Sequence, residues 1–116
     1  MIGQGEVWWA DLGEAVGSGP GFRRPVLIVQ GDALNRSALA TVVCVPLTSQ
    51  VKWAGAPGNV LLAPRETKLS KPSVANVSQI VALDRSVLRR RVGKIPQTRL
   101  AAVLFGIDVV LGRMPG

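Results

Sequence analysis

Short apolar stretches, separated by glycine, proline and small polar residues, run through most of this sequence and constrain its fold more than any other feature. Stretches of this length that are rich in β-branched residues and bounded by turn formers predict the strands of a small, mainly β domain. We expect strands at residues 6–11, 25–30, 40–47, 59–62, 73–83 and 89–95.

The segments between these strands are predicted to be loops or single turns. Residues 12–21 contain four glycines and a proline, which is typical of a flexible loop. Residues 31–37 and 84–88 are expected to form turns or short helical turns, and residues 50–58 and 64–72 to form longer loops. Within the strand expected at 73–83, alternation places these side chains on one face: Ala75, Val77, Val81 and Leu83.

The apolar period changes near the C-terminus. Pro96 suits the first turn of a helix and Gly112 suits its end. The apolar residues between them fall at helical spacing. Residues 1–116 are therefore expected to form a single domain, in which a mostly antiparallel, barrel-like sheet is closed by one C-terminal helix. The residues at helical spacing are Leu100, Val103, Leu104, Ile107 and Leu111.

The charge balance points to a polyanionic partner. Lysine and arginine together number 14 against 7 acidic residues, which gives a formal net charge of +7. A basic domain of this kind suits RNA, DNA or an acidic protein, although ordinary solubility is the plainer explanation. No apolar run is long enough to span a membrane, and the N-terminus lacks the features of a signal peptide, so we expect a cytoplasmic protein with no membrane association.

Missing residue types restrict the chemistry further. The chain has no histidine and no tyrosine, which excludes a histidine-based acid–base pair, a Ser–His or Cys–His triad and the usual zinc ligands. The acidic residues show no metal-like spacing, so no metal or other cofactor is expected. Cys44 is the only cysteine, and its apolar neighbours favour a buried hydrophobic role over a nucleophilic one.

Two adjacent arginines stand at the beginning of the second expected strand. Pro25 keeps Arg24 extended, so that its side chain leaves the strand at a defined angle. In an extended chain Arg23 then points to the opposite face. The planar guanidinium of Arg24 matches phosphate oxygens, but a solvated strand end explains the same residues equally well.

Hydroxyl residues follow the third expected strand. Thr48 and Ser49 can donate hydrogen bonds to phosphate there, or they can cap a turn. In the next loop, Lys52 and Trp53 form a pair suited to phosphate contact and base stacking. The basic run at residues 86–94 fits either a polyanion track or a charged strand edge. The adjacent Trp8 and Trp9 are expected to lie on opposite faces of the first strand, one of them in the core.

Taken in order, several segments resemble the MazF/PemK toxins of bacterial toxin–antitoxin systems. They are GEVWWADL, GSGPGFRRPVLIVQGDALNR, VVCVPLTS and SVANVSQIVALD, followed by the helix. The resemblance implies a mainly β fold, an SH3-like barrel of the MazF/Kid/CcdB type with a C-terminal helix. It also implies a homodimer that cleaves single-stranded RNA without a metal, through attack by the ribose 2′-hydroxyl. A MazE-like antitoxin with an acidic tail would cover the site.

By position, the resemblance assigns the catalytic roles to Arg24 and Thr48. Stabilisation of a crowded, negatively charged transition state by a guanidinium and a hydroxyl agrees with this assignment. The RNA contacts are expected from a larger set of residues, namely Arg23, Ser49, Gln50, Lys52, Trp53, Ser73, Asn76 and Gln79.

The chain departs from its relatives at two places. Many relatives have Glu-Gln where this chain has Gly19 and Pro20, and some, such as the Kid toxin, have Arg and Asp where it has Asn76 and Ser78. Neither place supplies a carboxylate, so no general base is identified, and Arg24 is expected to act mainly through its charge. A CcdB-like gyrase inhibitor and an inactive RNA-binding domain remain the alternatives.

Overall fold

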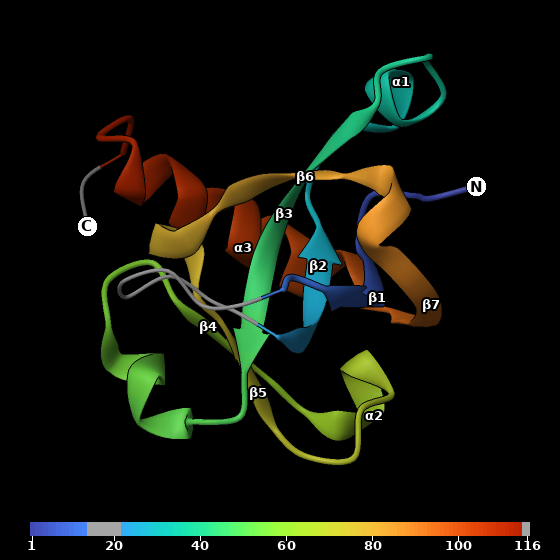
Figure 1. The fold of residues 1–116 in the computed structure, drawn as a ribbon. Coiled ribbons are helices and arrows are strands. Elements are labelled where there is room, and N and C mark those ends of the chain that lie inside the picture. Colours follow the sequence, from blue (N-terminus) through green and yellow to red (C-terminus); the bar gives the residue numbers. More distant parts are fainter. Residues whose placement is uncertain (14–21, 115–116) are drawn as a thin grey trace.

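A computed structural model describes residues 1–13 and 22–114 of the chain. Its sheet runs in the order β4-β5-β3-β2-β1-β7, and β6 also pairs with β3 (Figure 1). The strands are β1 (Glu6–Asp11), β2 (Arg23–Ile28), β3 (Thr41–Thr48), β4 (Val60–Leu62), β5 (Ser73–Ala75), β6 (Val81–Asp84) and β7 (Leu88–Lys94). The helices are α1 (Asp32–Asn35), α2 (Pro64–Thr67) and α3 (Gln97–Val110), with 3-10 turns η1 (Val51–Gly55), η2 (Val77–Gln79) and η3 (Arg85–Val87).

The central strand β3 changes partner along its length. Its first half pairs antiparallel with β6, and its last two residues pair with β5. Pro46 lies between these two pairings, where it has no amide hydrogen to contribute and its carbonyl accepts from the Asn76 amide at 3.0 Å. The strand expected at 40–47 therefore runs past Pro46 and continues to Thr48.

Most of the expected elements are present, with three informative differences. The strand expected at 73–83 is interrupted by η2, and the loop expected at 64–72 begins with α2. Pro64 at the start of α2 suits a first helical turn, and the Glu66 carboxylate accepts from the Ala63 amide at 2.9 Å. The second strand also begins two residues earlier than expected, because Arg23 pairs with Asp11 of β1.

Side-chain alternation divides the core between the two faces of the curled sheet. One cluster includes Val7, Leu27 and Val45 and is covered by α3, which crosses behind the sheet (Figure 1). The other lies on the opposite face and consists of Ala10, Val26, Ile28, Val42 and Cys44. None of the helices in the described part of the chain is long and apolar enough to cross a bilayer.

The C-terminal helix packs as its periodicity predicts, except at its end. Leu100 and Val103 are buried, and Leu104 and Ile107 pack against the same cluster. Leu111 is 60% exposed, contrary to expectation. The helix has already ended at Val110, so Leu111 projects beyond the core that the earlier turns cover.

Helix α3 contacts the segment that precedes β4 through backbone atoms of two glycines. A Cβ added at Gly106 would overlap the carbonyl oxygen of Gly58, and one added at Gly58 would lie 2.7 Å from the carbonyl oxygen of Gly106. Gly58 also has a φ of +80°, which disfavours any other residue. The two glycines therefore allow a closer approach of helix and turn than side chains would permit.

We predict that Gly106→Ala destabilises the fold by roughly 1–3 kcal/mol, because the added methyl group must push α3 away from Gly58. Urea unfolding followed by circular dichroism measures the change. Gly55→Ala is the matched control, since no atom lies within 4 Å of its added Cβ. Equal stability of the two variants would contradict the close contact.

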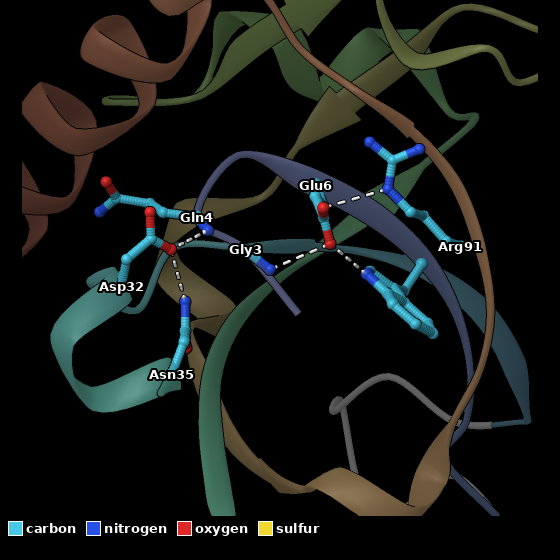
Figure 2. Close-up of polar contacts among 7 residues, drawn as sticks. Gly3, Gln4, Glu6, Asp32, Asn35 and Arg91 are labelled. Atoms are coloured by element: carbon cyan, nitrogen blue, oxygen red, sulfur yellow. Dashed lines mark hydrogen bonds and ion pairs between the residues drawn. The ribbon is translucent and has the colours of Figure 1, made fainter. Parts of the chain in front are cut away.

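Two carboxylates hold the N-terminal segment against the sheet (Figure 2). Glu6 accepts from the Gly3 amide and the Trp8 indole, each at 3.0 Å, and forms an ion pair with Arg91 at 3.1 Å. The Asp32 carboxylate accepts from the Gln4 amide at 2.8 Å. Burial raises the pKa of Glu6, but the hydrogen bonds from Trp8, Arg91 and Gly3 outweigh it, so the pKa lies below its ordinary value of 4.5.

We predict that Glu6→Gln lowers the free energy of unfolding at pH 7 by about 1–2 kcal/mol, since charge-assisted hydrogen bonds are lost. A carboxylate with a depressed pKa in the fold stabilises above its unfolded pKa and loses that effect as the pH falls through its folded pKa. The difference from wild type should therefore shrink below pH 4.5 in urea unfolding curves. A constant difference from pH 7 to pH 3 would contradict this role.

Candidate nucleic-acid interface

The end of β3 brings the two predicted catalytic residues onto one face of the sheet. β3 pairs with β2 through Pro46 opposite Val26, and with β5 through Thr48 opposite Val74. Continuing the β2–β3 register by two residues places Arg24 opposite Thr48. Directly opposite residues in an antiparallel pair lie on the same face, so these two side chains are cross-strand neighbours.

Arg24 is not neutralised by any described acidic residue. The ion pairs of the described residues engage Arg89, Arg91, Arg99 and Arg113 instead. Arg24 is half-buried, and its Nε is buried without a hydrogen-bond partner in the described part of the chain. A buried donor without a partner calls for an explanation, and an anionic ligand is a natural one for a guanidinium.

The hydroxyl of Thr48 has the turn-capping role that the sequence offered as one alternative. Its Oγ1 accepts from the Gln50 amide at 3.2 Å, which fixes the exit from β3. A hydroxyl has one hydrogen to donate in addition to its acceptor lone pairs. Capping therefore orients Thr48 without consuming its donor, and the donor is still available to a ligand.

The two 3-10 turns lie beside this strand end and carry further predicted residues. In η1 the Lys52 ammonium lies 5.4 Å from the centre of the Trp53 ring, and that ring is 47% exposed. The Asn59 side-chain amide donates to the Trp53 carbonyl at 2.9 Å and so ties η1 to the start of β4. Asn76 precedes η2, which ends at Gln79.

The opposite face of the same strand end contains a pocket of about 410 Å³. Arg23 pairs with Asp11, whereas Arg24 pairs with Ala10, so alternation along β2 predicts opposite faces for the two side chains. Both arginines nevertheless contribute to the pocket wall. The described residues that line the pocket include no acidic side chain, and they are Trp9, Arg23, Arg24, Pro25, Leu47, Ser49, Leu69, Ser70, Lys71 and Ser73.

The predicted residues therefore fall into two groups. Arg23, Ser49 and Ser73 line the pocket, whereas Thr48 and Asn76 belong to the other face. Thr48 is paired with Val74, one residue along β5 from the buried Ser73, so alternation separates the two groups. The structure does not gather all the candidate residues in one cavity.

The tryptophan pair behaves as alternation predicts. Trp8 packs against the second core cluster and donates from its indole to Glu6. Trp9 lines the pocket on the other face. The role of Trp9 was not foreseen, because two adjacent tryptophans do not reveal which of them packs in the core.

The basic run lies on β7, at one end of the strand order. Arg89 and Arg91 pair with Asp11 and Glu6 of the neighbouring strand, at 3.8 and 3.1 Å. This arrangement agrees with the interpretation of the run as a charged strand edge.

Sequence reasoning missed several residues at the two faces. Lys71 and Ser70 belong to the loop expected at 64–72, but nothing in the sequence placed that loop beside β2. Phe22, next to Arg23, is 67% exposed and has a left-handed φ of 58°. Asn59 could have been noticed as a turn former before a short apolar run, although its partners are remote in sequence.

The missing carboxylate is not supplied by the described part of the site. Gly19 and Pro20 lie outside the described residues, and the other position is occupied by Ser78, whose hydroxyl donates to Asn76 at 3.2 Å. Within residues 1–13 and 22–114, no group of three or more Cys, Asp or Glu side chains could hold a metal ion.

Comparison with known proteins identifies the class to which this fold and site belong. Residues 3–111 match the sequence model of the PemK-like, MazF-like toxins of type II toxin–antitoxin systems. The chain therefore belongs to this toxin family. The expected mainly β fold, a barrel-like antiparallel sheet with a C-terminal helix, is confirmed by solved structures of the family.

Relatives cover almost the whole chain. Endoribonuclease MazF6 of Mycobacterium tuberculosis is 44% identical over 96% of this chain and 97% of its own length. Endoribonuclease MazF of Staphylococcus epidermidis is 33% identical over 97% and 92%. A solved mycobacterial endoribonuclease in complex with its cognate antitoxin has a TM-score of 0.79, with 25% identity and complete coverage of both chains. MazF of Deinococcus radiodurans has a TM-score of 0.79, with 27% identity over 96% of each chain.

Cys44 allows a test of the second core cluster. The side chain is fully buried, as predicted from its neighbours, and burial raises the pKa of its thiol from 9.0 to about 12. At pH 8 this lowers the reactive thiolate fraction by about a thousandfold. We predict that a thiol-reactive dye labels the native protein at least that much more slowly than the urea-unfolded chain. Similar rates would show that the cluster is open.

Proposed function

We propose that this chain is an endoribonuclease toxin that cleaves single-stranded RNA, including messenger RNA, at short sequences and without a metal ion. The observation that carries the proposal is the buried Nε of Arg24, which has no hydrogen-bond partner among the described residues, on the strand that pairs with the Thr48 strand. Curated relatives that cover the chain are named endoribonucleases, which supports the same assignment.

The reaction uses a nucleophile that RNA itself provides. The ribose 2′-hydroxyl attacks the neighbouring phosphorus, the bond to the 5′ oxygen breaks, and the products are a 2′,3′-cyclic phosphate and a 5′-hydroxyl. The proton of the 2′-hydroxyl passes to water or a backbone acceptor, and the departing 5′ oxygen takes a proton from water. Only RNA supports this step, because DNA lacks the 2′-hydroxyl.

Arg24 and Thr48 stabilise the charge that develops during this reaction. The pentacoordinate phosphorus carries more negative charge on its oxygens than the ground state does, so fixed donors bind it more strongly. Arg24 supplies a planar, permanently charged fork, and Thr48 supplies a neutral donor whose orientation the Gln50 amide fixes.

The remaining candidate residues bind the RNA on both sides of the scissile phosphate. Lys52 and Trp53 offer a cation and an exposed ring on which a base can stack, and Asn76 and Gln79 lie beside them. On the pocket side, Arg23 contributes a cationic group and Ser49 and Ser73 contribute hydroxyl groups. Gln50, which follows Ser49 at the exit from β3, is a further candidate contact. Arg24 contributes to both sides, so the RNA would cross the strand end at this residue.

We further propose that a MazE-like antitoxin with an acidic tail neutralises the toxin at this surface. The net charge of +7 and the pocket lining without acidic residues suit such a segment. Solved relatives include MazE–MazF complexes from Deinococcus radiodurans. We also propose that the protein is a homodimer located in the cytoplasm.

We predict that wild-type protein cleaves RNA in the presence of EDTA and leaves 2′,3′-cyclic phosphate and 5′-hydroxyl ends, identified by mass spectrometry. Arg24→Ala and Thr48→Ala should each lower the rate about 10²–10³-fold, as expected for loss of one charge-stabilising donor. Arg24→Lys should also lose most activity, because the planar fork is gone.

The matched control is Arg36→Ala, which removes an exposed arginine at the end of α1, outside both faces of the site. It should cleave like wild type. RNA left intact by wild type across a broad set of sequences would reject the endoribonuclease and favour an inhibitor of a protein target, such as gyrase.

A further inference from the structure

Asn59 connects the two turns that lie beside the proposed catalytic pair. Its Nδ2 donates to the Trp53 carbonyl in η1 at 2.9 Å, and its Oδ1 accepts from the Val77 amide in η2 at 3.0 Å. One partner accepts and the other donates, so these contacts define which end of the Asn59 amide is nitrogen. The orientation of this side chain is therefore determined by backbone groups alone.

The orientation of the Asn59 amide in turn determines the orientation of the Asn76 amide. The Asn59 Nδ2 also contacts the Asn76 Oδ1 at 3.5 Å, and the Ser78 hydroxyl donates to the same oxygen at 3.2 Å. Two donors thus converge on the Asn76 carbonyl oxygen. The Asn76 Nδ2 donates to no described residue, so the amide presents its two N–H groups and withdraws its acceptor.

Asn76 lies on the face that carries Arg24 and Thr48. Its backbone amide donates to the Pro46 carbonyl at 3.0 Å, which continues the β3–β5 pairing of Leu47 with Ala75. In this register Asn76 is opposite Pro46, two residues from Thr48 and therefore on the same face of the sheet. Its N–H groups are therefore on the same face as Thr48, which belongs to the proposed reaction centre.

We infer that Asn76 reads one RNA base at a carbonyl oxygen and that Asn59 is the positioning residue that holds it in the donor orientation. This inference rests on the proposed function and adds a substrate preference to it. At the 4-position of a pyrimidine or the 6-position of a purine, a surface that offers only N–H groups favours the O4 of uracil or the O6 of guanine. It disfavours cytosine and adenine, which place an exocyclic amine there.

The two residues can be tested by reversing the polarity of the contact. Asn76→Asp replaces the two N–H donors with an acceptor, so the preferred base at one position should change from uracil or guanine to cytosine or adenine. Asn76→Ala should flatten the preference at that position by about 3–10-fold, the worth of one neutral hydrogen bond.

Asn59→Asp tests the positioning role without altering a group that contacts RNA. Its carboxylate repels the Asn76 Oδ1 and attracts the Nδ2, so the Asn76 amide should turn over and present its acceptor. The preference should then move toward cytosine or adenine at the same position that Asn76→Asp affects. A merely structural role for Asn59 would lower cleavage of every sequence equally and leave the preference unchanged.

The experiment is cleavage of a randomised RNA library, with the 5′-hydroxyl ends sequenced for wild type and each variant. Gln97→Glu is the charge-matched control, because it makes the same charge change at an exposed position in the first turn of α3. Thermal unfolding of each variant identifies any loss of folded protein.

Wild-type preference retained by both Asn76 variants would overturn the inference, even though the enzyme still cleaves. A changed preference in Asn76→Asp together with an unchanged one in Asn59→Asp would overturn the positioning role. Absence of cleavage by wild type would instead reject the proposed endoribonuclease and, with it, this inference.

Discussion

The antiparallel register at the end of β3 is the constraint on which the rest of the site depends. β3 is held there by β2 on one edge and by β5 on the other, and each pairing is set by backbone hydrogen bonds. Successive residues point to opposite faces, so the register separates Thr48 from Ser49 and the pocket, whereas Arg24 contributes to the pocket wall. A slip of one residue would exchange the two groups and expose the core side chains of the same strands.

The distribution of charge follows from the same scaffold. Among the described residues, Glu6, Asp11, Glu66 and Asp108 form ion pairs with arginines of β7, α3 and the C-terminal turn, and none with the arginines at the start of β2. The framework thus neutralises its own carboxylates with arginines that have no proposed role at the site. The cations at the strand end keep their charge for a ligand, which is where the excess of basic over acidic residues becomes useful.

The sequence was sufficient wherever neighbouring residues determine the outcome. Alternation predicted β1 and the different directions of Arg23 and Arg24 along β2, and helical spacing predicted α3. Prediction from the sequence failed where the outcome depends on contacts between remote segments. The interruption after β5 follows from the Asn59 side chain accepting from Val77, and the pocket depends on a loop folding back beside β2. Lys71, Trp9 and Asn59 were missed for this reason, since no local pattern distinguishes them from ordinary turn or strand residues.

The bare-backbone contact between Gly58 and Gly106 has a consequence for how the molecule moves. Gly58 directly precedes Asn59, so the turn that carries this side chain abuts the middle of α3 with no flexible side chain between them. A displacement of that turn cannot be absorbed by a change of rotamer and must move the helix or separate from it. The edge of the site should therefore open together with the helical half of the core, as part of one cooperative unit, instead of fraying as an independent surface loop.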